Sequence, residues 1–310
     1  MDLAVEAGRL RLDVLAVRLG DALAAAGVPH ALLKGPTTAR WLYDVPRTYR
    51  DVDLLVPFGE LPRAVAVLRR AGLARPDAGR LGEEAPHSLL LHSTEGFEVD
   101  LHVALPAMTP AGDLVWDVLG PGVVPFDLDV GTVPALDLPG RCVVLALHAL
   151  NSPSSPQARE DLDRARRRAD AATWRRADEL AHRLGVADLF GAGLALADAA
   201  AGTVAPPLTR RAYLRVVDAP PVALGLERVA AAPWRRRPLL LARELVPSRG
   251  FMHRAHPGTA TGSLPLVRAH LRRWRWIARQ LPAALQLRRQ ARAATAGARA
   301  TDRPGAGVTR

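Results

Sequence analysis

The sequence predicts an α+β protein, in which a small mixed β-sheet with flanking helices precedes an all-helical C-terminal region. Short apolar segments with strand-like composition are confined to roughly the first 135 residues, and helical patterns alternate with them. After that point the apolar spacing is that of helices alone. We therefore predict a mixed domain at 1–135, a helical domain at 136–282 and a basic, disordered tail at 283–310.

The first elements follow from apolar spacing and from turn residues. An amphipathic helix is predicted over 2–27, because Gly27-Val28-Pro29 ends the pattern. A short strand at 30–34 leads into a turn at Gly35-Pro36, and proline suits the first position of the next helix, which runs to about Tyr43.

The next strand, 51–56, carries an unusual pair of charges. Asp51 and Asp53 are two positions apart, so both side chains lie on one face of the strand, opposite Val52 and Leu54. A helix at 58–71 follows and Gly72 closes it. A hairpin then joins 88–92 to 97–105 around Thr94-Glu95-Gly96, with Asp100 in the middle of its second arm.

The remaining elements are predicted to be helices, at 138–150, 159–184, 186–200, 208–217, 221–231, 236–246 and 265–282. The segment Leu264–Leu287, which contains the last of them, is a basic amphipathic helix. Its apolar side chains are Leu266, Val267, Leu271, Trp274, Ile277, Ala278 and Leu281. We expect this side to pack on its own domain, with a membrane surface or nucleic acid as the alternatives.

Composition and charge exclude several classes of protein. Residues 266–310 hold eleven arginines and one acid, so they carry +10 of the formal +11 and leave about +1 for the rest. This distribution argues against a protein-wide nucleic-acid surface. One cysteine excludes an intrachain disulfide and predicts a cytoplasmic location. No run of about 18 apolar residues exists, so no membrane span is expected.

Lys34 is the only lysine, because the other 41 of the 42 basic residues are arginines. An ammonium is a compact point charge, whereas a guanidinium is a wide planar fork. A lysine kept in such a chain indicates a narrow, anion-binding place such as a phosphate pocket, with chance as the alternative.

The three aspartates predict a metal site. Asp51 and Asp53 lie within an apolar strand that should be buried. Burying a carboxylate there costs free energy unless a cation compensates its charge. With Asp100 on a neighbouring strand, they form an oxygen donor set that favours Mg²⁺ or Mn²⁺. Three carboxylates allow two ions about 3.5–4 Å apart, the arrangement used for in-line displacement at phosphorus.

The order of these pieces resembles the nucleotidyltransferase superfamily that includes DNA polymerase beta. It is most similar to a bacterial family of largely uncharacterised nucleotidyltransferases with a helical C-terminal domain. The residues that carry the resemblance are Lys34-Gly35, Arg47, Asp51-Val52-Asp53 and Asp100-Leu101-His102, and it continues through Leu147-His148 and the helix near Asp161 and Asp163.

The resemblance implies a role for each matched residue. Asp51 and Asp53 would bridge both metals, and Asp100 would bind the catalytic metal and take the acceptor's proton. Gly35 would cradle the phosphates of an NTP, with Lys34 and Arg47 as further nucleotide contacts. Pro36 departs from the family pattern because it has no N–H. Lys34, or the hydroxyls of Thr37 and Thr38, would compensate.

Other residues have two interpretations. Arg47 either grips phosphate or pairs with a nearby acid, and Arg50 is assigned the second role. His102 shares the strand face of Asp100 and either orients Asp100, touches substrate, or has a packing or hydrogen-bonding role. His148 is interpreted as a core histidine, and Asp161 and Asp163 as solvated or capping residues.

The predicted function is Mg²⁺-dependent transfer of an NMP group from NTP to a hydroxyl, amine or phosphate acceptor. A natural-product metabolite or peptide is the first acceptor and RNA, such as a tRNA end, the second. One alternative is metal-dependent glycosyl transfer, for which too little chain precedes Asp51. Another is a non-catalytic scaffold of the same fold that binds a partner through its basic tail.

Overall fold

The computed structural model describes residues 3–45, 47–76, 87–108, 112–199, 209–217, 219–247, 249, 251–252 and 263–301. Seven strands form one mixed sheet in the order β3-β4-β5-β2-β1-β7-β6. The strands are β1 (Ala31–Leu32), β2 (Asp51–Leu55), β3 (Ala74–Pro76), β4 (Ser88–Ser93), β5 (Glu98–His102), β6 (Val123–Leu128) and β7 (Gly131–Leu136). The α+β prediction is therefore confirmed.

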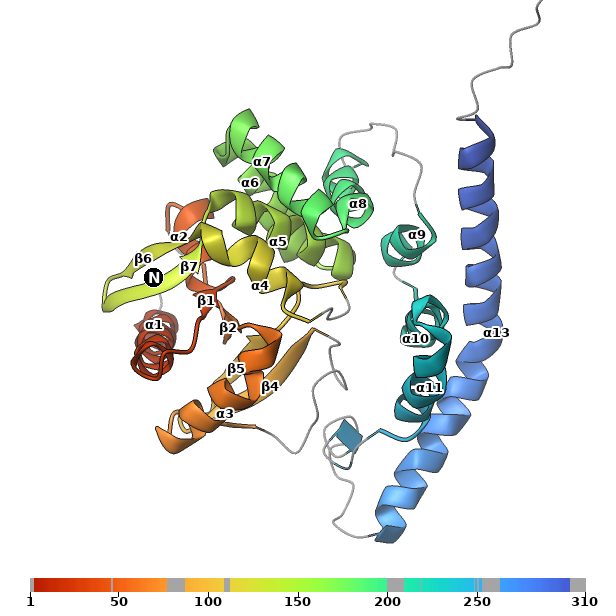
Figure 1. Cartoon of the computed structure of the whole chain (residues 1–310), viewed down its shortest axis with the longest axis horizontal. Helices are drawn as coiled ribbons and strands as arrows, with labels where there is room; N and C mark the ends of the chain where they lie inside the picture. Colours follow the sequence, from red (N-terminus) through yellow and green to blue (C-terminus); the bar gives the residue numbers. More distant parts are fainter. Residues whose placement is uncertain are drawn as a thin grey trace, which may run out of the picture.

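The first helices lie around the sheet, and the described part of the chain after β7 contains helices without strands (Figure 1). The described helices are α1 (Leu3–Ala25), α2 (Pro36–Leu42), α3 (Leu61–Arg70), α4 (Leu114–Leu119), α5 (Leu138–Asn151), α6 (Pro156–Arg168), α7 (Ala171–Arg183), α8 (Ala187–Ala199), α9 (Arg210–Val216), α10 (Pro221–Ala231), α11 (Arg237–Leu245) and α13 (Ser263–Thr301), with 3₁₀ turns η1 (Phe58–Glu60), η2 (Gly120–Gly122) and η3 (Trp234–Arg236).

Each face of the sheet has its own apolar core. On one face, Val52 and Leu54 pack with α1 and α3. On the other, Leu55 and Leu33 pack with α4 and with α5 to α8. Because side chains alternate along a strand, Asp51 and Asp53 share the face of Leu55 and point toward the helical segment. The helical segment that begins at α5 thus shares a core with the sheet, and the division at residue 135 stays a prediction.

A buried charge network ties α1 to the segment that leads into β2. Asp13 is fully buried, and Arg9 Nη1 lies 3.1 Å and Arg40 Nη2 2.8 Å from its Oδ2 atom. The Tyr49 hydroxyl also donates to Asp13. Arg40 further reaches Asp129, between β6 and β7, at 2.9 Å. One carboxylate therefore fixes α1, α2 and the loop before β2 relative to one another.

Several element predictions are wrong in detail. The single helix predicted over 159–184 is two helices, because Asp170 accepts a hydrogen bond from Thr173 N at 2.7 Å and begins α7 there. The strands β3, β6 and β7 were not predicted, and η1 replaces the start of the helix predicted from residue 58. The end of the helix predicted over 186–200 and the start of that over 208–217 lie outside the described residues.

The prediction that the tail is disordered from residue 283 is also wrong for the first part of that tail. Helix α13 continues to Thr301, and Ala284 and Ala291 are buried against Leu214, Ala219 and Ala223. Alanine is the strongest helix former, so an Ala- and Arg-rich segment extends a helix readily once one side can pack. Residues 302–310 lie outside the described part. None of the described helices is long and apolar enough to cross a membrane.

We predict that Asp13→Ala lowers the free energy of unfolding by about 2 kcal/mol or more, because it removes the fully buried carboxylate that joins Arg9, Arg40 and Tyr49, while Arg9 keeps Glu6 and Arg40 keeps Asp129 as partners. Urea denaturation followed by circular dichroism measures this change. Asp163→Ala, which removes an exposed carboxylate 3.8 Å from Arg167, is the control and should alter stability by less than about 0.5 kcal/mol. Equal effects of the two variants would contradict a structural role for Asp13.

Candidate active site

Asp53 and Asp100 lie side by side on neighbouring parallel strands. The register pairs Asp53 of β2 with Asp100 of β5, and Asp51 with Glu98. One carboxylate oxygen each from Asp53 and Asp100 and a ring nitrogen of His102 lie within 4.8 Å of one another. The predicted convergence of carboxylates from separate strands is therefore present for Asp53 and Asp100.

Asp51 lies on the same face, two residues before Asp53, and belongs to the cavity described below rather than to that group of three. Burial and the charge of Asp53 raise the pKa of Asp51 to about 6. Burial also raises the pKa of Asp100, with the charge of Asp53 adding to the effect against the opposing influence of His102. The two carboxyl groups beside Asp53 thus hold protons more tightly than usual, mainly because they are buried and in addition because of the charge of Asp53.

Lys34 and His102 supply the charge compensation for Asp53. Lys34 Nζ lies 3.3 Å and His102 Nε2 2.7 Å from the same oxygen, Asp53 Oδ1. Burial raises the pKa of Asp53, but these two partners outweigh it and hold the pKa well below its usual range. Burial lowers the pKa of Lys34, and the carboxylates, Asp53 first, more than reverse this. The one lysine of the chain is therefore an ammonium paired with a buried carboxylate.

Histidines form one wall behind the carboxylates. Because ionised Asp53 can only accept, His102 donates to it from Nε2. The ring of His87 stacks on that of His102 with centroids 5.4 Å apart. Burial lowers the pKa of His87 to about 3, and the charge of His102 lowers it in the same direction. Burial, together with the charge of Lys34, also lowers the pKa of His148 to about 3. His87 and His148 are thus neutral at physiological pH. His102 was predicted to orient Asp100, but its hydrogen bond goes to Asp53.

Gly35 makes the tight turn between β1 and α2. Its φ is +67°, and a Cβ there would lie 3.4 Å from Asp51 O and 3.5 Å from the Tyr49 ring. The chain therefore passes close behind Asp51 at a position that favours glycine. Thr37, predicted to contact nucleotide, is buried, and its hydroxyl donates to Leu33 O at 3.3 Å.

Arg47 is held by a carboxylate that the sequence interpretation missed. Arg47 Nη2 lies 2.6 Å from Asp161 Oδ2, and Arg47 Nε lies 3.2 Å from Asp161 Oδ1. Asp161 is 2% exposed and also accepts from Tyr43 at 2.6 Å and from Gln157 at 3.0 Å. It is therefore neither a solvated nor a capping residue.

A helical pattern in the sequence could have revealed Asp161. Its neighbours Ala158, Leu162 and Ala165 are buried at helical spacing, so Asp161 lies on the apolar face of α6. A carboxylate at such a position requires a partner. Asp163, two residues on, has no such constraint and is exposed to solvent near Arg167.

These residues surround a cavity of about 440 Å³ between the sheet and the helices α5 and α6. Thr38 and Arg50 line it, whereas Thr37 and Asp100 do not. Its walls are formed by Lys34, Gly35, Thr38, Arg47, Thr48, Tyr49, Arg50, Asp51, Asp53, Leu145, His148, Ser155, Gln157, Ala158 and Asp161. Basic groups, hydroxyls and carboxylates therefore face one space, which suits an anionic ligand held beside a cation.

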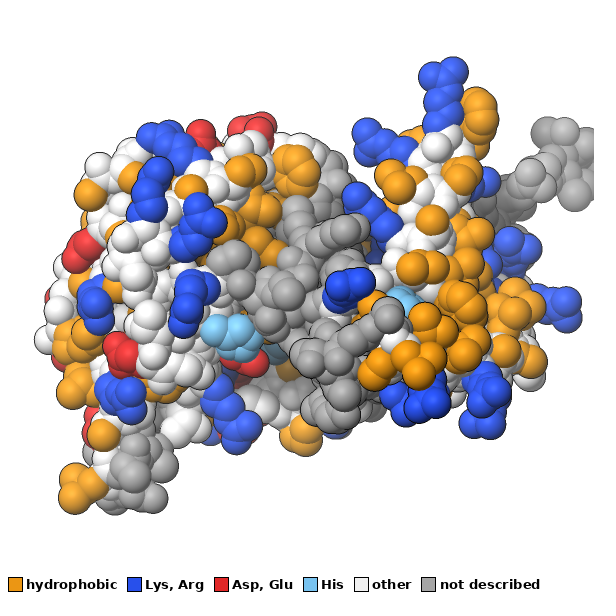
Figure 2. All heavy atoms as spheres, turned by 90° about the horizontal axis from the view of Figure 1, so that it is seen from below, with side chains coloured by type: hydrophobic (Ala, Val, Ile, Leu, Met, Phe, Trp, Pro, Cys, Tyr) orange, Lys and Arg blue, Asp and Glu red, His pale blue; other side chains and the backbone are white. Residues whose placement is uncertain are grey.

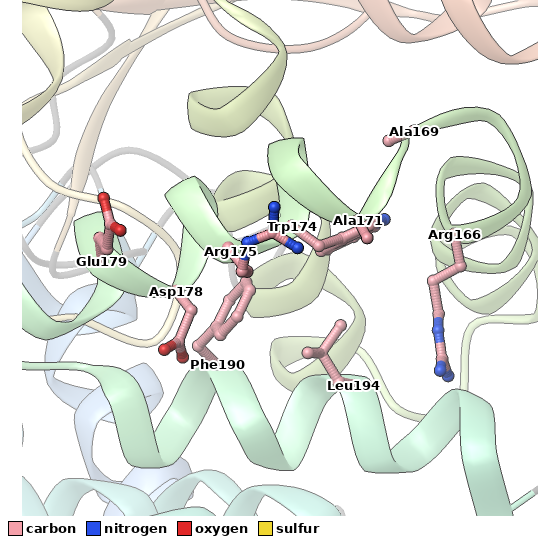
Figure 3. Close-up of a pocket in the computed structure, with 9 residues that line it drawn as sticks. All are labelled: Arg166, Ala169, Ala171, Trp174, Arg175, Asp178, Glu179, Phe190 and Leu194. Atoms are coloured by element: carbon pink, nitrogen blue, oxygen red, sulfur yellow. The ribbon is translucent and has the colours of Figure 1, made fainter.

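A larger hollow of about 800 Å³ lies between α6, α7 and α8 (Figure 3). Trp174 and Phe190, with ring centroids 6.3 Å apart, line it together with Leu194, Arg175 and Asp178. The described residues that line it include none of the predicted site residues. The candidate active site is therefore the smaller, more polar cavity.

Comparison with solved structures finds several similar chains, two of which are described in connection with antibiotics. The chain is similar to the antibiotic-resistance factor ANT(2'')-Ia, with 16% identity and a TM-score of 0.34 over 61% of this chain and 95% of that one. It is similar to the lincosamide antibiotic adenylyltransferase LnuA, with 13% identity and a TM-score of 0.36 over 50% of this chain and 96% of that one. JHP933 from Helicobacter pylori matches with 11% identity and a TM-score of 0.32 over 72% of this chain and 97% of that one. These similarities are too low to assign a substrate or mechanism.

No curated protein matches the chain. A family model does match, and it covers residues 3–202, which include both strands of the acidic cluster and all helices that line the cavity. The chain therefore belongs to the family of uncharacterised nucleotidyltransferases.

Proposed function

We propose that the protein transfers an NMP group from an NTP to a small-molecule acceptor in the cavity between β2 and α6, and that the reaction requires Mg²⁺ or Mn²⁺. The observation that carries the proposal is the convergence of Asp53 and Asp100 beside Lys34, at the edge of a cavity lined with basic groups. Family membership supports nucleotidyl transfer as the reaction class.

The residues of the site fit a divalent cation. Asp51, Asp53 and Asp100 offer carboxylate oxygens, the donors that Mg²⁺ and Mn²⁺ prefer. The raised pKa values of Asp51 and Asp100 come first from burial and in addition from the charge of Asp53, and a bound cation would favour the ionised form of both. Mg²⁺ held by these oxygens would neutralise the phosphate charge and make the phosphorus more susceptible to attack.

The chain's own residues bind and orient the two substrates. Lys34 keeps Asp53 ionised and offers an ammonium to the triphosphate, and Gly35 lets the backbone approach it closely. We assign the hydroxyl contact to Thr38 in place of Thr37, because Thr38 lines the cavity. Asp100, whose pKa is raised, is suited to take a proton from the acceptor.

The size of the cavity favours a small acceptor. A space of about 440 Å³ is in the range of sites that enclose small ligands. A natural-product metabolite or peptide is therefore the first acceptor class, with a tRNA end as the second. The alternative is a non-catalytic scaffold of the same fold that binds a partner through its basic tail.

We predict that Asp53→Asn and Asp100→Asn each lower nucleotidyl transfer by at least about a hundredfold, because each removes a charge placed at the reacting phosphate. The protein is incubated with each of four labelled NTPs, Mg²⁺ and cell extract, and the labelled product is followed. Glu98→Gln, an exposed carboxylate on the same strand β5, is the control and should retain activity. Transfer that survives both aspartate changes, with the fold intact by circular dichroism, would exclude these residues from the mechanism.

We predict that the affinity for Mg²⁺ falls up to tenfold per pH unit below about pH 6, because a cation must then displace the proton of Asp51. Calorimetric titration with Mg²⁺ between pH 5 and 7.5 measures this, and Asp51→Asn should flatten the profile. In the metal-free protein, the stability of the fold depends on pH in the direction opposite to that of the Mg²⁺ affinity. The folded pKa exceeds the ordinary 3.8, so ionisation of Asp51 lowers stability as pH rises from about 4 to above 6. An Mg²⁺ affinity independent of pH would contradict this role.

We predict that Asp161→Asn raises the KM for NTP by about tenfold with a much smaller change in kcat, because it releases the guanidinium of Arg47 from its position in the cavity wall. Steady-state kinetics at saturating acceptor separates the two constants. Asp163→Asn on the same helix is the matched control. If Asp161→Asn leaves KM unchanged, Arg47 pairs with Asp161 for structural reasons only.

A further inference from the structure

Helix α13 has three different faces along its first 30 residues. With 3.6 residues per turn, Ala269, Ala284 and Ala291 fall on one side, and all three are fully buried. Ala284 and Ala291 belong to the apolar cluster shared with α9 and α10. This side satisfies the packing expected of an amphipathic helix, so the other two faces are free to do something else.

The second face is an apolar stripe that the protein leaves in water. Its members lie three, four or seven residues apart, on one side of the helix, and are between 37% and 61% exposed. They are Leu264, Val267, Leu271, Trp274, Leu281 and Leu285. The expectation that this apolar side packs on its own domain is therefore wrong for Val267, Leu271, Trp274 and Leu281. A stripe of this kind extends over about 30 Å of helix, at 1.5 Å per residue.

The third face, next to the apolar stripe, is a row of arginines. Arg268, Arg272, Arg275 and Arg279 are spaced by four, three and four residues, and all four are exposed. The sequence of α13 contains neither Asp nor Glu. Figure 2 shows hydrophobic side chains gathered over this part of the molecule with basic side chains along their edge. Positive charge therefore borders the exposed apolar surface with no acid on the helix to neutralise it.

Helix α11 widens the apolar surface beyond a single stripe. Trp274 Nε1 donates to Leu245 O at 2.7 Å, and Arg273 Nη2 donates to Glu244 O at 3.1 Å, so the end of α11 is held against the middle of α13. Leu245 and the following Val246 are both exposed at this junction. The surface thus spans two helices and includes a tryptophan, the residue enriched where apolar and polar layers meet.

We propose that this surface of α11 and α13 docks on an anionic lipid bilayer. The apolar stripe would enter the boundary between headgroups and acyl chains, and the arginine row would contact lipid phosphates. The binding is interfacial, because the described helices include none able to span a membrane. The proposal concerns a surface that shares no residue with the cavity and does not depend on the transfer chemistry.

Charge and shape distinguish this occupant from the other candidates. A second copy of the chain placed stripe to stripe would bring two unneutralised arginine rows together, which is repulsive. The phosphates of a nucleic acid would neutralise the arginines. A nucleic acid offers little aliphatic surface, however, for the five exposed leucine and valine side chains of the apolar stripe. An anionic bilayer satisfies both the charge and the apolar stripe.

Flotation of the full chain with lipid vesicles tests the proposal. We expect binding to vesicles of equal parts phosphatidylglycerol and phosphatidylcholine and little binding to pure phosphatidylcholine. Leu271→Ser should lower the partition coefficient about tenfold, because it removes one inserted side chain. Arg272→Gln should lower it about fivefold, the value of one basic residue near an anionic surface.

Two matched variants control for general effects of the substitutions. Leu10→Ser changes a leucine of α1 that is 43% exposed, against 44% for Leu271, and Arg167→Gln changes an arginine of α6 that is 67% exposed. Both should bind vesicles like the parent, and circular dichroism and nucleotidyl transfer should be unchanged in all four variants.

Four results would overturn the proposal. They are equal binding to neutral and anionic vesicles, failure to bind anionic vesicles, equal losses in the control variants, and a Leu271→Ser variant that dissociates a dimer without affecting vesicle binding. Binding of RNA that is weakened by Arg272→Gln but not by Leu271→Ser, with no vesicle binding, would assign the surface to nucleic acid instead.

Discussion

The pairing of Lys34 with Asp53 is the interaction on which the site depends. Asp53 is nearly inaccessible to solvent, and Asp51 and Asp100 crowd it with further negative charge. A buried carboxylate is stable only when a cation or several hydrogen bonds compensate it. Lys34 and His102 meet this requirement at a single oxygen of Asp53, so the fold tolerates the cluster and leaves its remaining oxygens available to a ligand.

A second constraint holds the far wall of the cavity in place. The sheet supplies the acids, while α5 and α6, which share a core with that sheet face, supply His148 and Asp161. The Arg47–Asp161 pair closes the space between the two, and the Asp13 network positions Tyr49 on the third side. The cavity is therefore a product of both segments, although they follow one another in sequence with different secondary structure.

The sequence predicted the acidic cluster because local rules determine it. Alternation along a strand places Asp51 and Asp53 on one face, and the apolar flanks show that the strand is buried. The sequence did not predict β6, β7 or the partner of Arg47. Strands β6 and β7 pair only with each other and with the two-residue β1, so their identity depends on non-local contacts. Arg47 and Asp161 are 114 residues apart, and only the fold brings them together. The helix beyond residue 282 was missed for the same reason, because its buried alanines are recognisable only once α9 and α10 lie against them.

The division of labour between lysine and arginine follows from the shapes of their charged groups. Arginine forms the two-pronged contacts of the frame, as in Arg47 with Asp161 and Arg40 with Asp13, where a planar fork meets a carboxylate. Lys34 instead reaches one oxygen in a place shared with His102 and bordered by the tight turn at Gly35. A guanidinium there would span both oxygens of Asp53 and occupy the donors that a divalent cation needs. A point charge leaves them accessible, which is a physical reason for a chain with 41 arginines to keep a single lysine at this position.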